Sequence, residues 1–287
     1  MSLTRRRFLT ISASAAFAGS SARAALWQGQ ALGADVSLSL RGQSATRPLI
    51  NALRTELDRI EGCFSLHRAS ELTELNRTGR VTGSRMMREV LGLSRRVNRV
   101  TDGLFDPCVQ SLWAARIAGR GGKLASGVQD IEIRREIHLP EGARLTFNGI
   151  AQGYATDRIA ALLQAAGFSD VLIDMGEMRA LGGDFRVGIG DPAAGVVGQV
   201  TLKAGRALAT SSPAALRFAD GSSHIIGPQG QPPVWSSVTV EADSAAIADA
   251  ASTAFVLMER ARIEVAARRL GLHRIFLTDQ TGDLSRI

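Results

Sequence analysis

Apolar and polar positions along the chain follow two different periods, which predict strands and helices in turn. Residues 31–42 alternate between apolar and polar side chains, as a strand with one buried face does. Residues 47–64 place leucine and isoleucine three or four positions apart, which predicts an amphipathic helix. A second helix is predicted across residues 86–100, where it ends before an Asp-Gly pair.

The second half of the chain mixes strands and helices more closely. A helix is predicted over 157–167, and it is followed by predicted strands over 170–174, 184–190 and 197–202. These elements lack the strict strand-helix alternation of a doubly wound parallel sheet, so the pattern predicts the α+β class. No internal repeat or low-complexity linker divides the chain.

The first residues have a different character from the rest. Three consecutive arginines at 5–7 are followed by an uncharged stretch over 8–22 and by an A-x-A cleavage site at 22–24. This order predicts a twin-arginine signal peptide over 1–24 and a mature domain over 25–287. We therefore expect export to the periplasm by the twin-arginine route.

Composition narrows the classes of partner. The four arginines of the predicted signal account for more than half of the formal net charge of +7, and only one Tyr and three Trp could stack on bases. The basic charge is therefore weak evidence for nucleic acid, and no such partner is expected. No apolar run after the signal approaches the ~20 residues that span a bilayer, so stable membrane insertion is not expected either.

Several familiar motifs are incomplete or lie in the wrong context. Residues 188–193 fit a dinucleotide-binding G-x-G-x-x-A pattern, but the Asp-Pro pair inside them favours a turn after a strand. The four histidines lack zinc spacing, and no G-x-S-x-G elbow occurs. Cys63 and Cys108 are compatible with a disulfide or with two buried thiols.

The stretch TFNGIAQGYATD, residues 146–157, joins a predicted strand to a helix-like run. Gly149 and Gly153 flank apolar residues and Gln152 there. Glycines at this point predict either an ordinary sharp turn or a backbone that comes close to a neighbouring group before a helix N-terminus.

The run over 243–259 predicts a helix with Ser244 as its N-cap. Asp249 and Thr253 are four positions apart, so they share a face amid alanines. Their oxygens are hard donors that suit Mg²⁺. The same spacing also fits a solvated aspartate and a threonine that bonds back to its own helix.

Two further polar residues have open roles. His224 lies in a Gly/Pro-rich loop over 221–233, where it could contact phosphate or stand at a hairpin edge. Asp106 precedes Pro107 in an apolar context, which fits an acidic helix cap as well as a ligand contact.

Taken in order, these stretches resemble the FAD:protein FMN transferases, the ApbE-type flavin transferase family. The resemblance extends from about Ala31 to the C-terminus and implies a two-lobed α+β fold of mixed sheets flanked by helices. It rests on the runs ALGADVSLSL, FSLHRASELTELNR, TDGLFDPCVQSLW, LTFNGIAQGYATDRIA, VLIDMGEMRALGG, FRVGIGDP, ALATSS, SHIIGPQGQPP and SVTVEADSAAIADAASTAFVLM.

The resemblance implies an exported, Mg²⁺-dependent enzyme that uses FAD as its substrate. Such an enzyme attaches the FMN half through a phosphodiester to a Thr or Ser hydroxyl of another protein and releases AMP. The implied partner is an acceptor flavoprotein of a periplasm-facing electron-transfer system.

The resemblance also implies roles for particular residues. The Gly149 carbonyl, the Asp249 carboxylate and the Thr253 hydroxyl would bind Mg²⁺, and Asp249 and His224 would be the catalytic residues. The remaining implied contacts with FAD are Leu32, Ser65 and His67 near the flavin ring, Phe105, Asp106 and Pro107 at the adenosine part, and Gln152 and His224 at the phosphates.

Several positions depart from the family's usual pattern. Thr146 and Gly227 stand where an Asp is common, Gln152 where Lys or Glu is common, and His67 where Tyr is usual, while residues 212–214 replace a Gly-Asp-Tyr-type segment. Loss of acidic groups leaves a second interpretation open. The protein would then be a periplasmic FAD-binding protein with weak or lost transfer activity, or an FAD pyrophosphatase.

Overall fold

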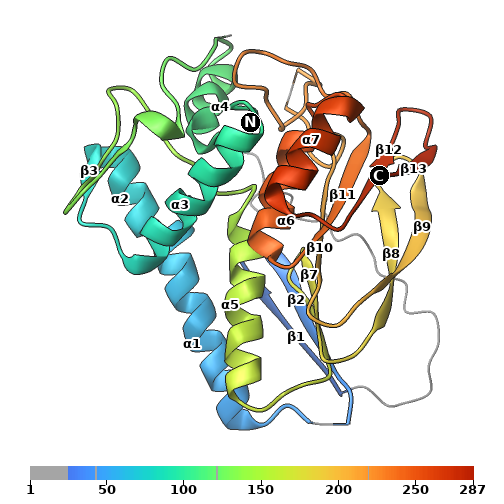
Figure 1. Ribbon diagram of the computed structural model, residues 1–287. Coiled ribbons are helices and arrows are strands. Elements are labelled where there is room, and N and C mark those ends of the chain that lie inside the picture. The colour runs from blue at the N-terminus through green and yellow to red at the C-terminus, as the bar shows by residue number, and fades with distance from the viewer. Residues whose placement is uncertain (1–24, 43, 121, 219) are drawn as a thin grey trace.

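An eight-stranded antiparallel sheet organises the molecule (Figure 1). This computed structural model describes residues 25–287 except 43, 121 and 219, and the predicted signal peptide lies outside this part of the chain. The sheet has the order β1-β2-β6-β7-β10-β11-β12-β13. Its strands are β1 (Ala25–Ala31), β2 (Ala34–Leu40), β6 (Val171–Asp174), β7 (Met178–Leu181), β10 (Ala207–Ser211), β11 (Ser237–Ala242), β12 (Arg274–Thr278) and β13 (Leu284–Arg286).

Two smaller sheets complete the strand content of the described residues. A hairpin of β8 (Phe185–Asp191) and β9 (Gly195–Leu202) packs its apolar side chains against those of β6, β7, β10 and β12. A short sheet of β3 (Arg80–Val81), β5 (Ile137–His138) and β4 (Glu132–Ile133) lies apart from the main one. Residues 188–193, where the sequence predicted a turn after a strand and not a dinucleotide motif, lie in β8 and the turn that follows it.

Helices pack on the other side of the main sheet, where α5 and α6 contact its central strands (Figure 1). The α+β class is confirmed, with antiparallel ladders throughout the described strands. The helices are α1 (Arg47–Phe64), α2 (Glu71–Thr78), α3 (Arg85–Val100), α4 (Gln110–Ile117), α5 (Ala151–Ala165), α6 (Ala245–Phe255) and α7 (Arg260–Leu270), with 3₁₀ turns η1 (Pro107–Val109) and η2 (Val128–Asp130).

The start of one helix and the presence of one strand depart most from the sequence prediction. Helix α5 begins at Ala151 rather than at 157, because the Ala151 amide already donates to the Phe147 carbonyl at 2.7 Å. Gln152 and Gly153 therefore belong to the first turn of the helix. The N-terminal strand β1 was not predicted. It pairs with β2 through a tight turn in which Leu32 and Gly33 both have positive φ.

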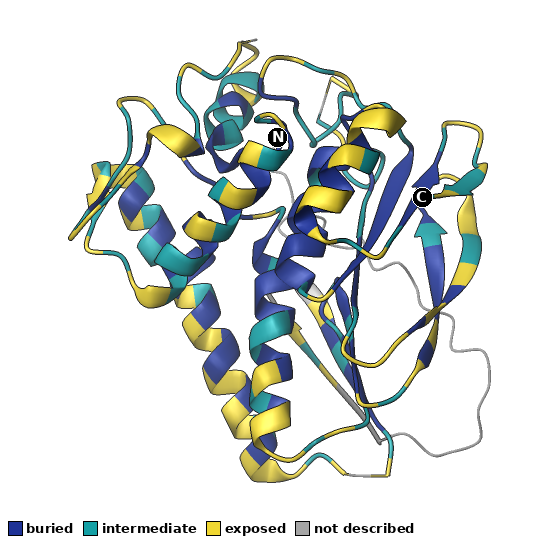
Figure 2. Ribbon diagram, in the orientation of Figure 1, coloured by how far each residue is buried: buried dark blue, intermediate teal, exposed yellow. Residues whose placement is uncertain are grey.

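The core lies mainly between the main sheet and the helices. Figure 2 shows α6 as buried along almost its whole length. Its alanines are small enough for the helix to pack closely against β10, β11 and α5 at the same time. Ser244 caps α6, as predicted, by accepting a hydrogen bond from the Ile247 amide at 3.3 Å.

The structure decides the state of the two cysteines. Cys63 and Cys108 are both buried free thiols, so the disulfide that the sequence left open is not formed. Burial raises the pKa of Cys63 to about 12, which makes it a poor nucleophile.

Across residues 25–287, leaving aside the three undescribed positions, no helix is both long and apolar enough to cross a membrane.

Gly153 sets the distance between α5 and α6. A methyl group at this position would lie 2.3 Å from the Ala245 carbonyl oxygen and 2.8 Å from the Ala246 Cα. These neighbours are backbone atoms of α6 and cannot turn aside. Only a residue without a side chain permits this approach.

We predict that Gly153→Ala destabilises the fold by about 1–3 kcal/mol, because the added methyl overpacks a helix-helix contact. Urea denaturation measures the change. Gly92→Ala is the matched control, because Gly92 is also in a helix but has no neighbour within 4 Å. That control should gain about 0.5–1 kcal/mol from helix propensity. Equal effects of the two substitutions would contradict the close contact.

Candidate active site

A cavity of about 140 Å³ lies where the start of α5 and the second half of α6 meet the end of β10. Two loops, before α4 and before β11, provide much of the remaining wall, and the turn between β6 and β7 contributes to it as well. Most of the residues that the sequence nominated for the site line this cavity. They are Phe105, Asp106, Pro107, Gly149, Gln152, His224, Asp249 and Thr253.

Helices α5 and α6 bring the predicted metal-binding residues together. A methyl group on Gly149 would lie 2.9 Å from Thr253 Oγ1, so the glycine backbone rests directly against the threonine side chain. One turn along α5, the Gly153 amide donates to Asp249 Oδ2 at 3.1 Å. Of the two interpretations of these glycines, the close approach to a neighbouring group is the one that the structure shows. Both glycines allow a close approach, and the neighbouring group in each case is on α6.

The alternative reading of Asp249 and Thr253 as a solvated aspartate and a self-bonded threonine is wrong. Asp249 is only 3% exposed. Thr253 Oγ1 lies 3.1 Å from Ser211 Oγ, which in turn lies 2.8 Å from Ser252 Oγ. The threonine hydroxyl is therefore held at the cavity wall by a chain of hydroxyl groups that joins α6 to β10.

Glu177 is a site residue that the sequence analysis missed. It follows the turn after β6, lines the cavity and is 6% exposed. Its carboxylate accepts a hydrogen bond from the Thr210 amide at 3.2 Å. The only sequence signal is an acidic residue directly after a turn glycine that ends an apolar strand. Nothing in that pattern shows that the side chain points inward.

Glu177 and Asp249 form a buried pair of acids. Desolvation raises the pKa of Asp249 to about 7, against a smaller opposing effect of its hydrogen bond from Gly153. Desolvation also raises the pKa of Glu177, and the charges of Asp249 and Asp174 raise it further. In the described part of the chain no cationic side chain offsets either carboxylate. The pair is therefore stabilised by a proton or by a bound cation.

Gln152 lies beside this pair. A methyl group at Gly176 would approach the Gln152 side-chain nitrogen to 2.9 Å, so the amide packs on the turn that carries Glu177. Gly176 has a φ of +90°, which favours glycine in any case. The amide of Gln152 is thus a neutral donor and acceptor at the cavity wall.

Asp106 has a structural role in addition to lining the cavity. It caps η1, with Oδ1 accepting from the Cys108 amide at 2.9 Å, as the acidic-cap reading predicts. The Val128 amide and the Asn98 side chain also donate to its carboxylate. Burial nevertheless raises the pKa of Asp106. The oxygens that would contact a ligand are already engaged with the protein.

His224 is half-buried: it lines the cavity and also lies directly after Ser223, which forms an isolated antiparallel bridge with Arg217, so the structure fits both interpretations of this residue. Its Nδ1 lies 3.0 Å from the Leu216 carbonyl oxygen, and its ring packs edge-on against Trp113. Desolvation lowers the pKa of His224, although hydrogen bonds to the backbone of Leu216 and Pro213 oppose this effect. The neutral ring, which can accept a proton, is therefore favoured near neutral pH.

Three nominated residues lie outside the cavity. Leu32, Ser65 and His67 gather at the C-terminal end of α1, where the Leu32 amide donates to Glu61 Oε1 at 3.0 Å. Ser65 Oγ accepts from the His67 amide at 3.1 Å. The structure does not bring these residues together with the acidic pair, and their role in contacting the flavin stays a prediction.

The two positions that lack an expected aspartate differ in their surroundings. Thr146 is buried at the cavity wall, and its Oγ1 accepts from the Asn148 amide at 3.2 Å. Gly227 lies in a tight turn, where a methyl group would meet Gln231 Oε1 at 2.4 Å and the Gln231 amide nitrogen at 2.7 Å. An aspartate at this second position would not fit the loop as it stands.

The donor set of the cavity suits a hard divalent cation. It offers a buried carboxylate, a hydroxyl and a backbone segment close together, beside a second carboxylate with no cationic partner among the described residues. Within the same described ranges, no group of three or more His, Cys, Asp and Glu side chains is arranged to bind a metal. A site here would therefore depend on mixed oxygen donors.

Solved structures share this α+β architecture. The apo flavinyl transferase ApbE of Pseudomonas stutzeri superposes with a TM-score of 0.77 at 23% identity, over 92% of this chain and 94% of that one. The ApbE protein of Thermotoga maritima gives 0.78 at 24% identity, over 92% and 97%. At these identities the likeness shows the fold alone.

The family follows from the sequence comparison. The model of the ApbE family matches residues 32–276, so the protein belongs to this family. An FAD:protein FMN transferase of Rhodobacter capsulatus is 34% identical over an alignment of 212 positions, which covers 64% of this chain and 40% of that protein. The protein of the same name from Escherichia coli K12 is 26% identical over an alignment of 297 positions, which covers 89% of this chain and 84% of that protein.

The buried acids predict a pH effect on stability. A folded-state pKa raised above the unfolded value gives stability that is complete below the unfolded pKa and is lost as pH rises through the folded pKa. For Asp249 this window runs from 3.8 to about 7. In EDTA, wild-type protein should therefore lose at least about 1 kcal/mol relative to Asp249→Asn between about pH 5 and pH 8. Denaturation curves with the same pH dependence for both proteins would contradict the raised pKa of Asp249.

Proposed function

We propose that this protein is an Mg²⁺-dependent FAD:protein FMN transferase. It attaches FMN through a phosphodiester to a Thr or Ser hydroxyl of an acceptor protein and releases AMP. The bond between the FMN phosphorus and the AMP oxygen breaks, and the same phosphorus bonds to the acceptor oxygen. Family membership and the names of the relatives support the class of reaction.

One observation carries the proposal. Gly149 lies in the turn before α5, and Asp249 and Thr253 lie on α6, far along the chain, yet the three meet in one cavity with a second buried carboxylate at Glu177. Buried acids without a cationic partner are costly for the fold alone. A cation bound between them and a diphosphate would offset that cost, which accounts for their presence at this place.

The metal would be bound by the Gly149 carbonyl, the Asp249 carboxylate and the Thr253 hydroxyl. When bound, Mg²⁺ would neutralise charge that develops on the diphosphate as the leaving bond breaks. The protein's own contribution is positioning. The Gly153 amide fixes the orientation of Asp249, and Ser211 fixes the hydroxyl of Thr253.

His224 is the candidate base for the acceptor hydroxyl. Gly227 provides no carboxylate, and the half-buried ring of His224, whose pKa is lowered by desolvation, lines the same cavity. The ring can accept the proton of the acceptor hydroxyl, so one histidine would serve as the base without a carboxylate at position 227. Gln152 would donate to a phosphate oxygen from the first turn of α5.

The setting of the reaction is also proposed. The paired arginines and A-x-A site of residues 1–24 support export to the periplasm by the twin-arginine route. The acceptor would then be a flavoprotein of a periplasm-facing electron-transfer system.

A second candidate function has its own supporting observation. Gly227 sits in a turn too tight for a carboxylate, and Thr146 gives the cavity wall no charge. A protein so altered could bind FAD with weak transfer, or hydrolyse it to FMN and AMP. Mass spectrometry of an acceptor incubated with enzyme, FAD and Mg²⁺ separates these functions. AMP release without a labelled acceptor supports hydrolysis, and tight binding without AMP supports the binding protein.

Thr253 provides a sharp test of the metal site. We predict that Thr253→Val, which keeps the shape but removes the hydroxyl, lowers transfer on the order of 100-fold. Thr253→Ser keeps a hydroxyl at the same place and should retain most of the activity. FMN incorporation is followed by mass spectrometry over a range of Mg²⁺ concentrations. Equal activity of the two variants would remove the hydroxyl from the site.

His224 is tested separately. We predict that His224→Ala reduces the turnover of transfer at least about 100-fold, as loss of a general base does. FAD affinity is measured in parallel, so that a loss of binding is not mistaken for a loss of chemistry. Unchanged turnover would show that His224 takes no part in the mechanism.

A further inference from the structure

Asp157 of α5 caps the first turn of α6, a helix that begins far along the chain. Its Oδ2 accepts from the Ser244 hydroxyl at 2.7 Å and from the Ala246 amide at 3.1 Å, and its Oδ1 accepts from the Ala245 amide at 2.9 Å. The first amides of a helix have no partner within the helix. A carboxylate placed there also complements the helix dipole.

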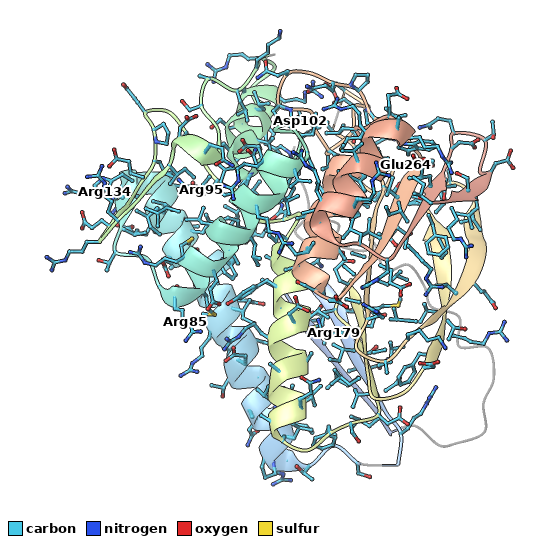
Figure 3. The ribbon with its side chains drawn as sticks, in the orientation of Figure 1. Arg85, Arg95, Asp102, Arg134, Arg179 and Glu264 are labelled. Carbon is cyan, nitrogen blue, oxygen red and sulfur yellow. The ribbon has the colours of Figure 1, made fainter. Side chains whose placement is uncertain are left out.

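Arg179 holds Asp157 in place from the sheet. Its guanidinium forms an ion pair with Asp157 Oδ1 and donates to the Asp243 carbonyl at 2.8 Å. In Figure 3, Arg179 is labelled beside α5, and it comes from β7. The carboxylate is therefore fixed by three elements, α6, β7 and its own helix.

The contact at Asp157 is the third of three evenly spaced contacts that α5 and the turn before it make with α6. Residues 149, 153 and 157 are spaced by four, and so are the α6 residues 253, 249 and 245 that they meet. Residues four apart share one helix face, so the two faces run antiparallel along each other. The first is a packing contact, and the second is a hydrogen bond from the Gly153 amide to the Asp249 carboxylate. The third combines several hydrogen bonds to the start of α6 with the ion pair to Arg179 of β7.

The contacts at Gly149 and Gly153 permit a close approach of the two helices. They do not by themselves fix the position of α6 along the axis of α5. A slide by one residue would move α6 by about 1.5 Å. Mg²⁺ demands near-ideal geometry, with oxygens at about 2.1 Å, so such a shift would separate the donors. The hydrogen bonds of Asp157 to the start of α6 are directional, and they oppose such a shift.

We propose that Asp157 is a positioning residue that sets the register of α6 against α5, and so places Asp249 and Thr253 relative to Gly149. Its effect on metal binding rests on the proposed function. Its effect on the helix register does not, because the Gly153 amide reports the register without any ligand.

The test compares Asp157→Ala and Asp157→Asn with the control Asp243→Ala. Asp243 is also acidic and lies beside the start of α6, but its carboxylate pairs with Arg206 and His273 and not with the α6 amides. Three quantities are measured: hydrogen exchange of the Gly153 amide, Mn²⁺ affinity in the presence of FAD, and FAD affinity in EDTA. Asp157→Asn keeps an accepting oxygen and guards against a variant that fails to fold.

We expect Asp157→Ala to speed exchange at Gly153 relative to the later amides of α5. It should also weaken Mn²⁺ binding about 10- to 100-fold, as loss of a supporting contact around a metal site does. FAD affinity in EDTA should hold, Asp157→Asn should be intermediate, and Asp243→Ala should resemble the wild type.

The proposal is overturned if Asp157→Ala changes neither the hydrogen exchange of the Gly153 amide nor the Mn²⁺ affinity and lowers only the overall stability. Asp157 would then be an ordinary helix cap. Wild-type protein that binds no Mn²⁺ would instead refute the proposed metal site. In that case the Gly153 amide alone decides the register: faster exchange in Asp157→Ala supports it, and unchanged exchange overturns it.

Discussion

The close packing of α5 against α6 is the contact on which the rest of the site depends. It requires glycine at position 153, because a methyl group there would collide with the Ala245 carbonyl. It also requires the alanine-rich surface of α6, which lets that helix lie against the sheet and against α5 together. The cavity forms at the end of this contact, where Gly149 faces Thr253.

Charge in the cavity follows from the same packing. Asp249 is buried because it lies on the face of α6 that packs against α5. There its carboxylate accepts a hydrogen bond from the Gly153 backbone amide. Glu177 reaches the same place from the turn after β6. Two acids buried near each other weaken the fold when both are ionised. Their cost becomes understandable if the fold is built to bind a cation between protein and diphosphate.

Sequence patterns predicted the parts of this structure that depend on local order. The helix periods over 47–64 and 86–100 correspond to α1 and α3, and the cap at Ser244 and the acidic cap at Asp106 are both present. These features are set by neighbours along the chain. The family resemblance added the nomination of Gly149, whose closeness to Thr253 no local pattern contains.

Features that depend on distant contacts could not be predicted in the same way. The start of α5 was placed too late, because two glycines weaken helix propensity and only the packing against α6 holds that first turn. Glu177 was missed because an acid after a turn normally faces solvent, and only the topology turns this one inward. The positions of Leu32, Ser65 and His67 outside the cavity likewise follow from where α1 ends.

The central claim is that oxygens of Gly149, Asp249 and Thr253 converge on one divalent cation that binds the diphosphate of FAD. Anomalous diffraction from crystals grown with Mn²⁺ and FAD tests it most directly. The account predicts an anomalous peak between the Gly149 carbonyl, the Asp249 carboxylate and the Thr253 hydroxyl, in contact with the diphosphate. FAD bound in the cavity with no peak there, or with manganese held by other residues, would contradict it.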